Sequence, residues 1–322
     1  MERASRTPPA PGTAVADVAA RLRKAGCVFA EDEAELILSA ASTPDEADAM
    51  VARRADGEPL EHVVGFAEFH GLRIAVEKGV FVPRRRTEVL IREAAAVTRA
   101  GAVVVDLCCG SGALGAALAA EVRARPEQDG PEQDARDQNV TAQTAAAQHD
   151  GAQRDGPQRD GGQDANERGD GARRDGGERV ELHAADIDPV AVRCARRNVP
   201  GEVHEGDLFE ALPADLRGRV DVLLANVPYV PSREIGLLPS EARDHEARVA
   251  LDGGEDGLNV LRRVTADAAA WLAPGGHLLC EISERQVPAA LAAFAEGGLE
   301  PRIAVDEDWS ATVILGRRPR AS

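Results

Sequence analysis

The stretch AVVVDLCCGSGALGAALAAEV, residues 102–122, determines the predicted fold. Its first part, 102–106, is an apolar run typical of a buried strand, and its Ala- and Leu-rich second part predicts a helix that ends near Arg125. The glycines between them allow a tight turn in which the backbone approaches a ligand closely. Strand, glycine-rich turn and helix together are typical of the unit that is repeated in α/β sheets.

The sequence downstream repeats this alternation of strands and helices. We predict further strands at 180–186, 203–206, 220–226, 277–282, 302–305 and 311–315. We predict helices among them at 189–198, 258–272 and 287–296. Strands separated by helices indicate a parallel, doubly wound sheet. The predicted fold class is therefore α/β.

The N-terminal part of the chain has a different periodicity. Helices are predicted at 13–26, 32–41 and 43–57. The last of them begins with Thr43, Pro44 and Glu46 in the pattern of a capping box. From 62 to 82 the apolar residues recur with a period near two, which predicts a β-hairpin.

An interruption from 126 to 178 separates the first helix of the α/β part from its second strand. These 53 residues hold 13 acidic residues and six arginines, but no Leu, Ile, Phe, Met, Trp or Tyr. Such a segment cannot bury enough apolar surface to offset the entropy of ordering it, so we expect a disordered, low-complexity insert. The predicted domains are a helical domain over 1–57, whose first twelve residues form a disordered lead, a β-hairpin linker over 58–83 and an α/β domain over 84–322.

The composition limits the classes to which the protein can belong. Its 322 residues carry a net charge of −17, which repels phosphate backbones and disfavours a general nucleic-acid-binding protein. The five cysteines form no CxxC pair, which favours reduced thiols in a reducing compartment. No apolar run approaches the ~18 residues of a membrane span, and we see no signal peptide. We expect a cytoplasmic monomer without a membrane or direct nucleic-acid partner.

The turn after the first strand is a candidate site for a cofactor that contains a nucleoside. It consists of Cys108, Cys109, Gly110, Ser111 and Gly112. With Gly115 its glycines also match GxGxxG, so a nicotinamide dinucleotide is an alternative. Asp106 opposes that alternative, because a carboxylate at the strand end repels a pyrophosphate and attracts the ammonium group of an amino-acid tail. The same strand, loop and helix recur in methyltransferases that use S-adenosylmethionine.

Acidic residues that follow the next two strands are candidates to bind the rest of such a cofactor. Asp186 ends its strand and is predicted to accept hydrogen bonds from both ribose hydroxyls. It lies 80 positions after Asp106, but 27 when the insert is left out, near the ~20 expected past the glycines. Asp188 is interpreted as a helix cap before a proline. Asp207 is a candidate acceptor for the adenine amino group, with Leu208 against the ring.

The motif Asn226-Val227-Pro228-Tyr229 ends the strand at 220–226 and is the candidate catalytic site. In open α/β sheets, ligands bind outside these strand ends. The Asn226 side-chain oxygen and the Val227 carbonyl are placed to accept the two N–H groups of a planar –NH₂. Tyr229 is predicted to stack on that plane, and Pro228 to fix the turn.

Together these motifs resemble those of the release-factor glutamine-N5 methyltransferases, a family of class I S-adenosylmethionine-dependent methyltransferases. The resemblance covers about residues 58–318 without the insert, and includes GEPLEHVVGFAEFHGLRIAV (57–76), FVPRRRTE (81–88), DLCCGSG (106–112), AADIDP (184–189), GDLF (206–209), NVPY (226–229) and ALDGGEDGL (250–258). It implies a Rossmann-like fold, S-adenosylmethionine as the cofactor, and methylation of a glutamine in a protein, a peptide chain release factor, in translation termination.

The resemblance also implies roles for single residues. Those at 108–112 and Asp186 bind the cofactor, Leu208 flanks its adenine, and the motif at 226–229 holds the substrate amide. Four more residues match family positions near the cofactor: Pro83, Arg84, Thr87 and Glu88. The helices of 1–57 look like the family's substrate-recognition domain.

The chain departs from the family pattern at three places. Cys108 stands where the family usually has glycine, so the turn there must accept a side chain. Arg85 and Arg86 replace the usual proline and acid. Val227 replaces the first proline of the motif, which keeps the carbonyl but loses the fixed φ. These departures bear on the identity of the protein substrate more than on the reaction.

Three other functions remain as alternatives. The first is methylation of an exocyclic nucleobase amine, which the acidic charge disfavours. The second is a cofactor-binding protein without catalysis, and the third is the nicotinamide enzyme. The seven histidines show no HxxxH or HExxH spacing, so no metal site is predicted. Glu281, which ends a strand, is a candidate to face the site without an assigned role.

Overall fold

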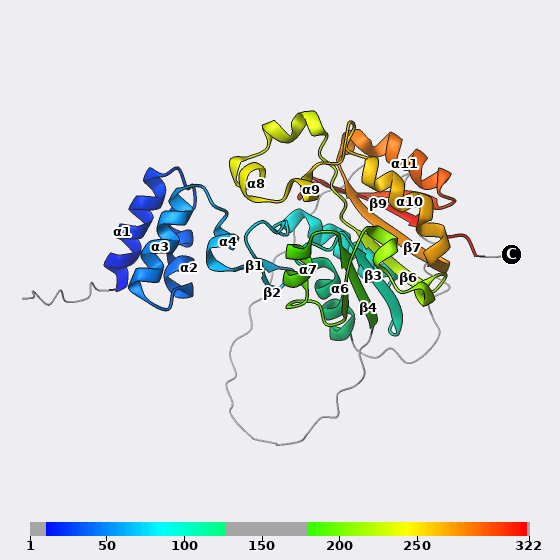
Figure 1. The fold of residues 1–322 in the computed structure, drawn as a ribbon, viewed down its shortest axis with the longest axis horizontal. Coiled ribbons are helices and arrows are strands. Elements are labelled where there is room, and N and C mark those ends of the chain that lie inside the picture. The colour runs from blue at the N-terminus through cyan, green and yellow to red at the C-terminus, as the bar shows by residue number, and fades with distance from the viewer. Residues whose placement is uncertain (1–10, 126–179, 321–322) are drawn as a thin grey trace, which may run out of the picture. The chain divides into compact units, whose positions relative to one another are not determined.

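The computed structural model describes residues 11–125 and 180–320 (Figure 1). The predicted lead over 1–12, apart from its last two residues, and the insert at 126–178 lie outside these described residues. The described residues up to Arg123 and from Val180 onward belong to one compact unit. Within these ranges, none of the helices combines the length and the apolar character that a membrane span requires.

The centre of the unit is a seven-stranded sheet with the order β5-β4-β3-β6-β7-β9-β8. Its strands are β3 (Ala102–Leu107), β4 (Val180–Asp186), β5 (Glu202–Glu205), β6 (Val220–Ala225), β7 (Leu272–Ile282), β8 (Glu300–Asp306) and β9 (Ala311–Arg317). The first five pair in parallel, whereas β9 is antiparallel to both β7 and β8. The sheet is thus mixed rather than wholly parallel, because the short link from β8 to β9 allows only an antiparallel pair.

Helices cover both faces of the sheet (Figure 1). They are α5 (Glu88–Val97), α6 (Ala113–Ala124), α7 (Pro189–Ala195), α10 (Asn259–Trp271) and α11 (Val287–Glu296). Two short helices, α8 (Ser240–His245) and α9 (Arg248–Leu251), lie in the segment that follows β6 and do not belong to these layers. Since strand side chains alternate between faces, Val104 packs with α5 and α6, and Val103 and Val105 with α10 and α11. Two apolar cores result, one on each face, and the predicted doubly wound α/β fold is confirmed. Helices α5, α8 and α9 were not among the predicted elements.

The N-terminal helices have an apolar core of their own, with Leu22, Ile37 and Val51 fully buried in it. They are α1 (Pro11–Lys24), α2 (Ala30–Ala40), α3 (Pro44–Ala55) and α4 (Leu60–Val64). The predicted cap of α3 is present, since the Glu46 N–H donates to Thr43 Oγ1 at 3.2 Å.

The hairpin is present too, as β1 (Phe66–Phe69) and β2 (Leu72–Ala75), which are antiparallel. It is shorter than the predicted 62–82, because the residues before Gly65 form α4. Gly65 ends that helix in the left-handed conformation.

Candidate active site

A cavity of about 590 Å³ lies at the carboxyl ends of β3, β4 and β6. Residues that follow these strands line it, among them Cys108, Asp186 and Asn226. Its wall also includes Pro83 and four residues around the start of α8, which are Leu238, Pro239, Glu241 and Ala242. Three motifs that lie far apart in the sequence therefore meet at one place, which is where open α/β sheets bind ligands.

The glycine-rich turn between β3 and α6 depends on left-handed backbone conformations. Cys108, Gly110 and Gly112 have φ values of 54°, 54° and 76°. A Cβ on Gly112 would lie 2.3 Å from Val199 Cγ2, so only glycine fits there. Cys108 does carry a side chain in this conformation, as the departure from the family pattern requires, and an L-residue there costs about 1–2 kcal/mol.

Four of the five residues of this turn line the cavity, and one does not. Cys108, Cys109, Gly110 and Ser111 are in the cavity wall, whereas Gly112 shapes the turn behind it. Burial raises the pKa of the Cys108 thiol, which stays protonated. The cavity wall here is therefore formed by small, uncharged groups.

Asp106 differs from its prediction. Its carboxyl group is buried beneath the turn rather than in the cavity wall, and Oδ2 accepts the Gly115 N–H at 2.9 Å. The reason is the alternation along β3, which gives Asp106 the same face as Val104, the face that α6 covers. Burial raises its pKa to about 7. In this structure Asp106 holds the first turn of α6.

Asp186 and Asp188 both line the cavity, but their carboxylates have different partners. Asp186 Oδ2 accepts the Gly110 N–H at 2.8 Å, and its Oδ1 accepts the Asp188 N–H at 2.9 Å. An ionised carboxylate has about four acceptor positions, so hydroxyl donors can still be bound. Burial raises the pKa of Asp186. Asp188 caps α7 by accepting the Val190 N–H at 2.8 Å, which confirms its interpretation as a cap.

Asp207 and Leu208 line the cavity after β5. Asp207 Oδ2 accepts from Arg263 Nη2 at 2.7 Å, a partner that the sequence did not reveal. Leu208 has a φ of 49°, again the left-handed region. Such a conformation in a leucine needs support from its surroundings, and it sets the direction of the backbone at the cavity wall.

Asn226 holds the most informative atom of the site. Its side-chain oxygen Oδ1 is buried and has no hydrogen-bond partner among the described residues. Asn226 lines the cavity together with Val227, Pro228 and Tyr229. Buried polar atoms almost always have a partner, so this oxygen indicates that a ligand donates a hydrogen bond there.

Tyr229 belongs to a network with Glu281, which was a candidate to face the site without an assigned role, and Arg86, which had no predicted role there. Glu281 Oε1 accepts from the Tyr229 hydroxyl at 3.0 Å and from Arg86 Nε at 2.8 Å. Thr87 Oγ1 donates to Glu281 Oε2 at 2.6 Å, and Arg86 also donates to the Tyr229 oxygen. Burial raises the pKa of Tyr229, so its hydroxyl stays a donor. Arg86 lines the cavity, whereas Glu281 is buried behind the cavity wall.

The four residues that match family positions near the cofactor have three different positions. Pro83 and Arg84 line the cavity, and Arg84 pairs with the buried Glu246. Thr87 lies behind the wall, where it contacts Glu281. Glu88 lies outside the cavity: its carboxylate accepts the His70 N–H at 3.3 Å. The placement of Glu88 near the cofactor is therefore not supported, because the turn into α5 directs its side chain toward the hairpin.

Comparison with known proteins finds relatives that are named as methyltransferases. No family model matches the sequence. A release factor glutamine methyltransferase of Streptomyces coelicolor is 32% identical over 282 residues, which cover 84% of this chain and 77% of that protein. One of Geobacter sulfurreducens is 30% identical over 254 residues, covering 77% and 69%. A 4-amino-L-phenylalanine/4-methylamino-L-phenylalanine methyltransferase of Streptomyces pristinaespiralis is 32% identical over 260 residues, also covering 77% and 69%.

Among solved structures, the ribosomal protein L11 methylase of Lactobacillus delbrueckii subsp. bulgaricus matches 77% of this chain and 86% of its own, at 14% identity and a TM-score of 0.43. A likeness of this degree adds no weight to the assignment. The relatives named release factor glutamine methyltransferase do support the assignment, since they are at least 30% identical to this chain and are matched over more than two-thirds of their length. The chain therefore belongs to the family of release factor glutamine methyltransferases, as its motifs predicted.

Proposed function

We propose that this protein transfers a methyl group from S-adenosylmethionine to the side-chain nitrogen of a glutamine in a peptide chain release factor. The observation that carries the proposal is the unpaired Oδ1 of Asn226 in the cavity. An amide oxygen there matches one N–H of a substrate –NH₂ group. The names of the relatives from Streptomyces coelicolor and Geobacter sulfurreducens supply the substrate class.

The cavity suits the cofactor in size and in the donors and acceptors of its wall. A volume of about 590 Å³ lies within the usual range of roughly 300–1,000 Å³ for small-molecule sites. Asp186 would bind the ribose hydroxyls, and Asp207 and Leu208 the adenine. The turn at 108–111 would contact the amino-acid part. When bound, S-adenosylmethionine supplies a methyl group on a positively charged sulfur.

The residues at 226–229 would orient the acceptor nitrogen. An amide nitrogen is a poor nucleophile, because its lone pair is delocalised into the carbonyl group. Asn226 Oδ1 and the Val227 carbonyl accept its two N–H groups, which aims the nitrogen and stabilises the positive charge that grows on it. Tyr229 stacks on the amide plane, and Glu281 and Arg86 hold its hydroxyl in place. Positioning and electrostatics supply the acceleration, and no general base is needed before transfer.

The protein substrate would be recognised by the N-terminal helices. Arg54 on α3 donates to Glu241 Oε1 at 2.6 Å, and Glu241 on α8 lines the cavity. This contact supports a substrate-recognition domain over 1–57, joined by the linker over 58–83 to the catalytic domain over 84–322. A protein bound to those helices would have direct access to the cavity.

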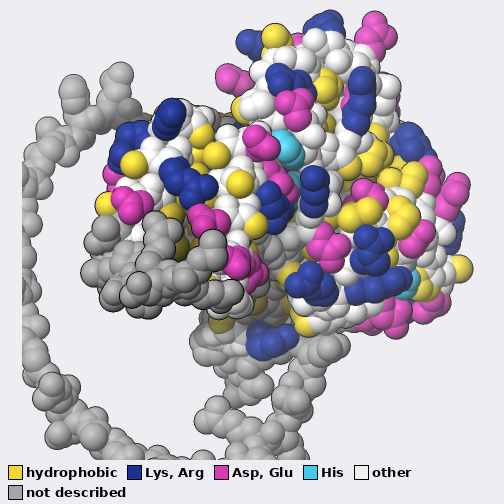
Figure 2. All heavy atoms as spheres, turned by 60° about the vertical axis from the view of Figure 1, so that its left-hand side comes forward, with side chains coloured by type: hydrophobic (Ala, Val, Ile, Leu, Met, Phe, Trp, Pro, Cys, Tyr) yellow, Lys and Arg dark blue, Asp and Glu magenta, His cyan; other side chains and the backbone are white. Residues whose placement is uncertain are grey.

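The remaining expectations belong to the same proposal: a cytoplasmic monomer that does not bind nucleic acid directly. Lys and Arg side chains are interspersed with Asp and Glu side chains on the face shown in Figure 2. Together with the net charge of −17, this disfavours a nucleobase as the substrate.

Single-turnover transfer to purified release factors, with the cofactor saturating, tests the proposal. Mass spectrometry of the product should locate one added methyl group on a glutamine side chain. A release factor with Glu in place of that Gln should remain unmodified. Transfer to a different residue type, or a bound cofactor without transfer, would contradict the proposal.

A second candidate substrate is an aromatic amine. It is favoured by the relative from Streptomyces pristinaespiralis, whose identity of 32% equals that of the first glutamine methyltransferase. An arylamine also presents a planar –NH₂ group to Asn226 and Val227. Incubation with 4-amino-L-phenylalanine separates the two, because the proposed enzyme should leave it unmethylated at concentrations that saturate the relative.

A further inference from the structure

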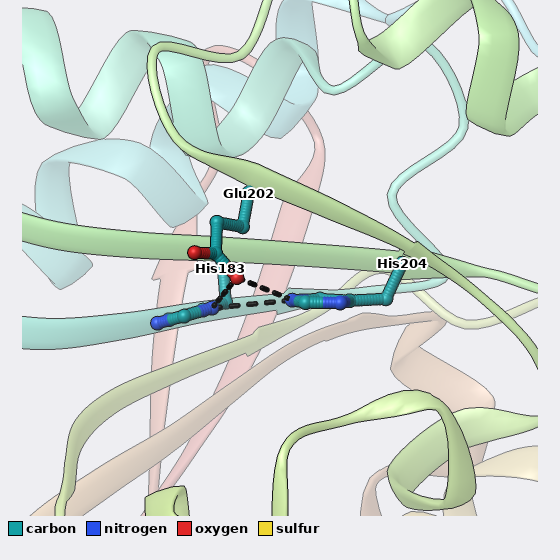
Figure 3. Close-up of side chains that lie close together, drawn as sticks. All are labelled: His183, Glu202 and His204. Carbon is teal, nitrogen blue, oxygen red and sulfur yellow. Dashed lines mark hydrogen bonds and ion pairs between the residues drawn. The ribbon is translucent and has the colours of Figure 1, made fainter.

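Three side chains with metal-binding atoms lie together on strands β4 and β5, outside the active site (Figure 3). His183 on β4 is the direct neighbour of Glu202 on β5 in the parallel register. His204 follows Glu202 by two positions, so all three side chains share one face of the sheet. No His or Glu spacing along the chain reveals this group, because its members come from two strands.

The distances among the three ligand atoms are close to those of a tetrahedral zinc site. His183 Nδ1 and His204 Nε2 are 3.2 Å apart. Two nitrogens that bind one zinc ion at 2.0–2.1 Å with a tetrahedral angle are about 3.3–3.4 Å apart. Glu202 Oε2 lies 3.7 Å from each of the two nitrogens. The Glu202 side chain is 70% exposed, so it has the freedom to move closer.

A further carboxylate sets the orientation of the His183 ring. His183 Nε2 lies 3.3 Å from Glu181 Oε1, and Arg219 Nη2 donates to the other oxygen of Glu181 at 3.1 Å. With its proton on Nε2, His183 directs the lone pair of Nδ1 toward His204 and Glu202. Histidines that bind metals usually donate their second ring nitrogen to such a carboxylate.

We propose that His183, Glu202 and His204 bind one divalent transition-metal ion, with zinc as the best match, and leave a fourth position for water. Histidine and carboxylate ligands of this kind suit zinc. In the absence of the ion, His204 Nε2–H donates to His183 Nδ1. Binding breaks that hydrogen bond, turns both nitrogens toward Glu202, and moves the His204 proton to Nδ1 by exchange with solvent.

The ion would stabilise the outer edge of the sheet. Strand β5 is an edge strand of the sheet, is four residues long and pairs with β4 alone. It leads directly into Gly206, Asp207 and Leu208 of the cavity wall. A metal ion held by both strands adds a link where hydrogen bonds are few. None of its ligands takes part in the proposed methyl transfer, so the two proposals stand or fall separately.

Calorimetric titration of the full chain with zinc chloride tests the site. We expect the wild type to bind one equivalent that His204→Ala and Glu202→Gln both lose. Glu181→Gln should bind it about 10–100-fold more weakly, because it only orients His183. His245→Asn, a histidine on α8 away from the three ligands, is the matched control and should bind like the wild type. Cobalt should give the visible bands of a four-coordinate ion in the wild type and not in His204→Ala.

Two outcomes would overturn the proposal. One is a wild type that binds no zinc, which leaves the two histidines as a hydrogen-bonded pair only. The other is an equivalent retained by both His204→Ala and Glu202→Gln, which places the ion elsewhere on the chain. Thermal unfolding in the presence of a chelator controls for misfolding, since each variant should still unfold in one cooperative transition, with His204→Ala lowered only by the loss of its hydrogen bond to His183.

Discussion

Asn226→Ala should greatly lower the rate of methyl transfer and leave the stability of the protein nearly unchanged. The Asn226 Oδ1 atom is buried without a partner among the described residues, which costs the folded state about 1–3 kcal/mol. Alanine removes that atom, but it also removes packing contacts of the amide group. The two effects have opposite signs. We therefore expect the free energy of unfolding of the cofactor-free protein to change by less than about 1 kcal/mol.

The same substitution should lower the rate of methyl transfer by about 10²–10³-fold, because the acceptor aimed at the substrate nitrogen is lost. Cofactor affinity should stay within a few-fold of the wild type, since Asn226 addresses the acceptor. Single-turnover kinetics with the cofactor saturating measures the rate, and urea unfolding measures the stability.

Asn198→Ala is the matched control, because the amide of Asn198 is satisfied. Its oxygen accepts the Ala75 N–H at 2.9 Å, and its nitrogen donates to Ala75 O at 2.9 Å and to Ser111 O at 2.8 Å. Loss of three hydrogen bonds should destabilise the fold by about 1.5–4.5 kcal/mol. The reasoning is refuted if Asn226→Ala destabilises the fold as much as this control, or if it keeps more than about a tenth of the wild-type rate.

Three further predictions follow from the site. Asp186→Ala should weaken cofactor binding by about 2–3 kcal/mol in calorimetry, and Asp188→Ala by much less; equal losses would mean that Asp186 does not bind the ribose. Gly112→Ala should lower the free energy of unfolding by more than about 2 kcal/mol in urea titrations, because φ is 76° and a Cβ would lie 2.3 Å from a neighbouring carbon; a smaller loss would show that the turn adapts. Burial raises the pKa of Asp106 from 3.8 to about 7, so the folded state keeps a proton that the unfolded chain releases. That contribution to the free energy of unfolding is complete below pH 3.8 and declines as the pH rises to about 7. Asp106→Asn should therefore flatten the dependence of stability on pH between these values. An unchanged dependence would refute the raised pKa of Asp106.

Local signals in the sequence were enough for most of the sheet and its helices. Strand β4 and helix α11 have the predicted bounds, because apolar runs with clear ends define both. Helix α4 was missed, since its five residues give too short a pattern to distinguish from a strand. The direction of β9 was also missed, because it depends on the length of the link from β8 and on pairing with β7.

The candidate site was predictable where its residues follow strands, and not where it depends on long-range contacts. Asn226 and Asp186 line the cavity as predicted, since strand ends converge in this fold. Glu281 and Arg86 meet across 195 positions, and no local pattern pairs them. For Asp106 a signal was present: alternation along its strand gives it the same face as Val104, away from the cavity.

The contact between Arg54 and Glu241 makes the N-terminal helices part of the electrostatic environment of the cavity wall. Arg54 is buried and is also bound to Glu33 at 2.7 Å, so its position depends on how α2 and α3 pack. A partner that binds these helices can strengthen or weaken the ion pair between Arg54 and Glu241, and so change the affinity of the cavity for its ligand. By linkage, the ligand in the cavity then changes the affinity of the helices for the partner by the same factor. On the proposed function, a release factor bound to these helices would in this way also change the affinity of the cavity for the cofactor.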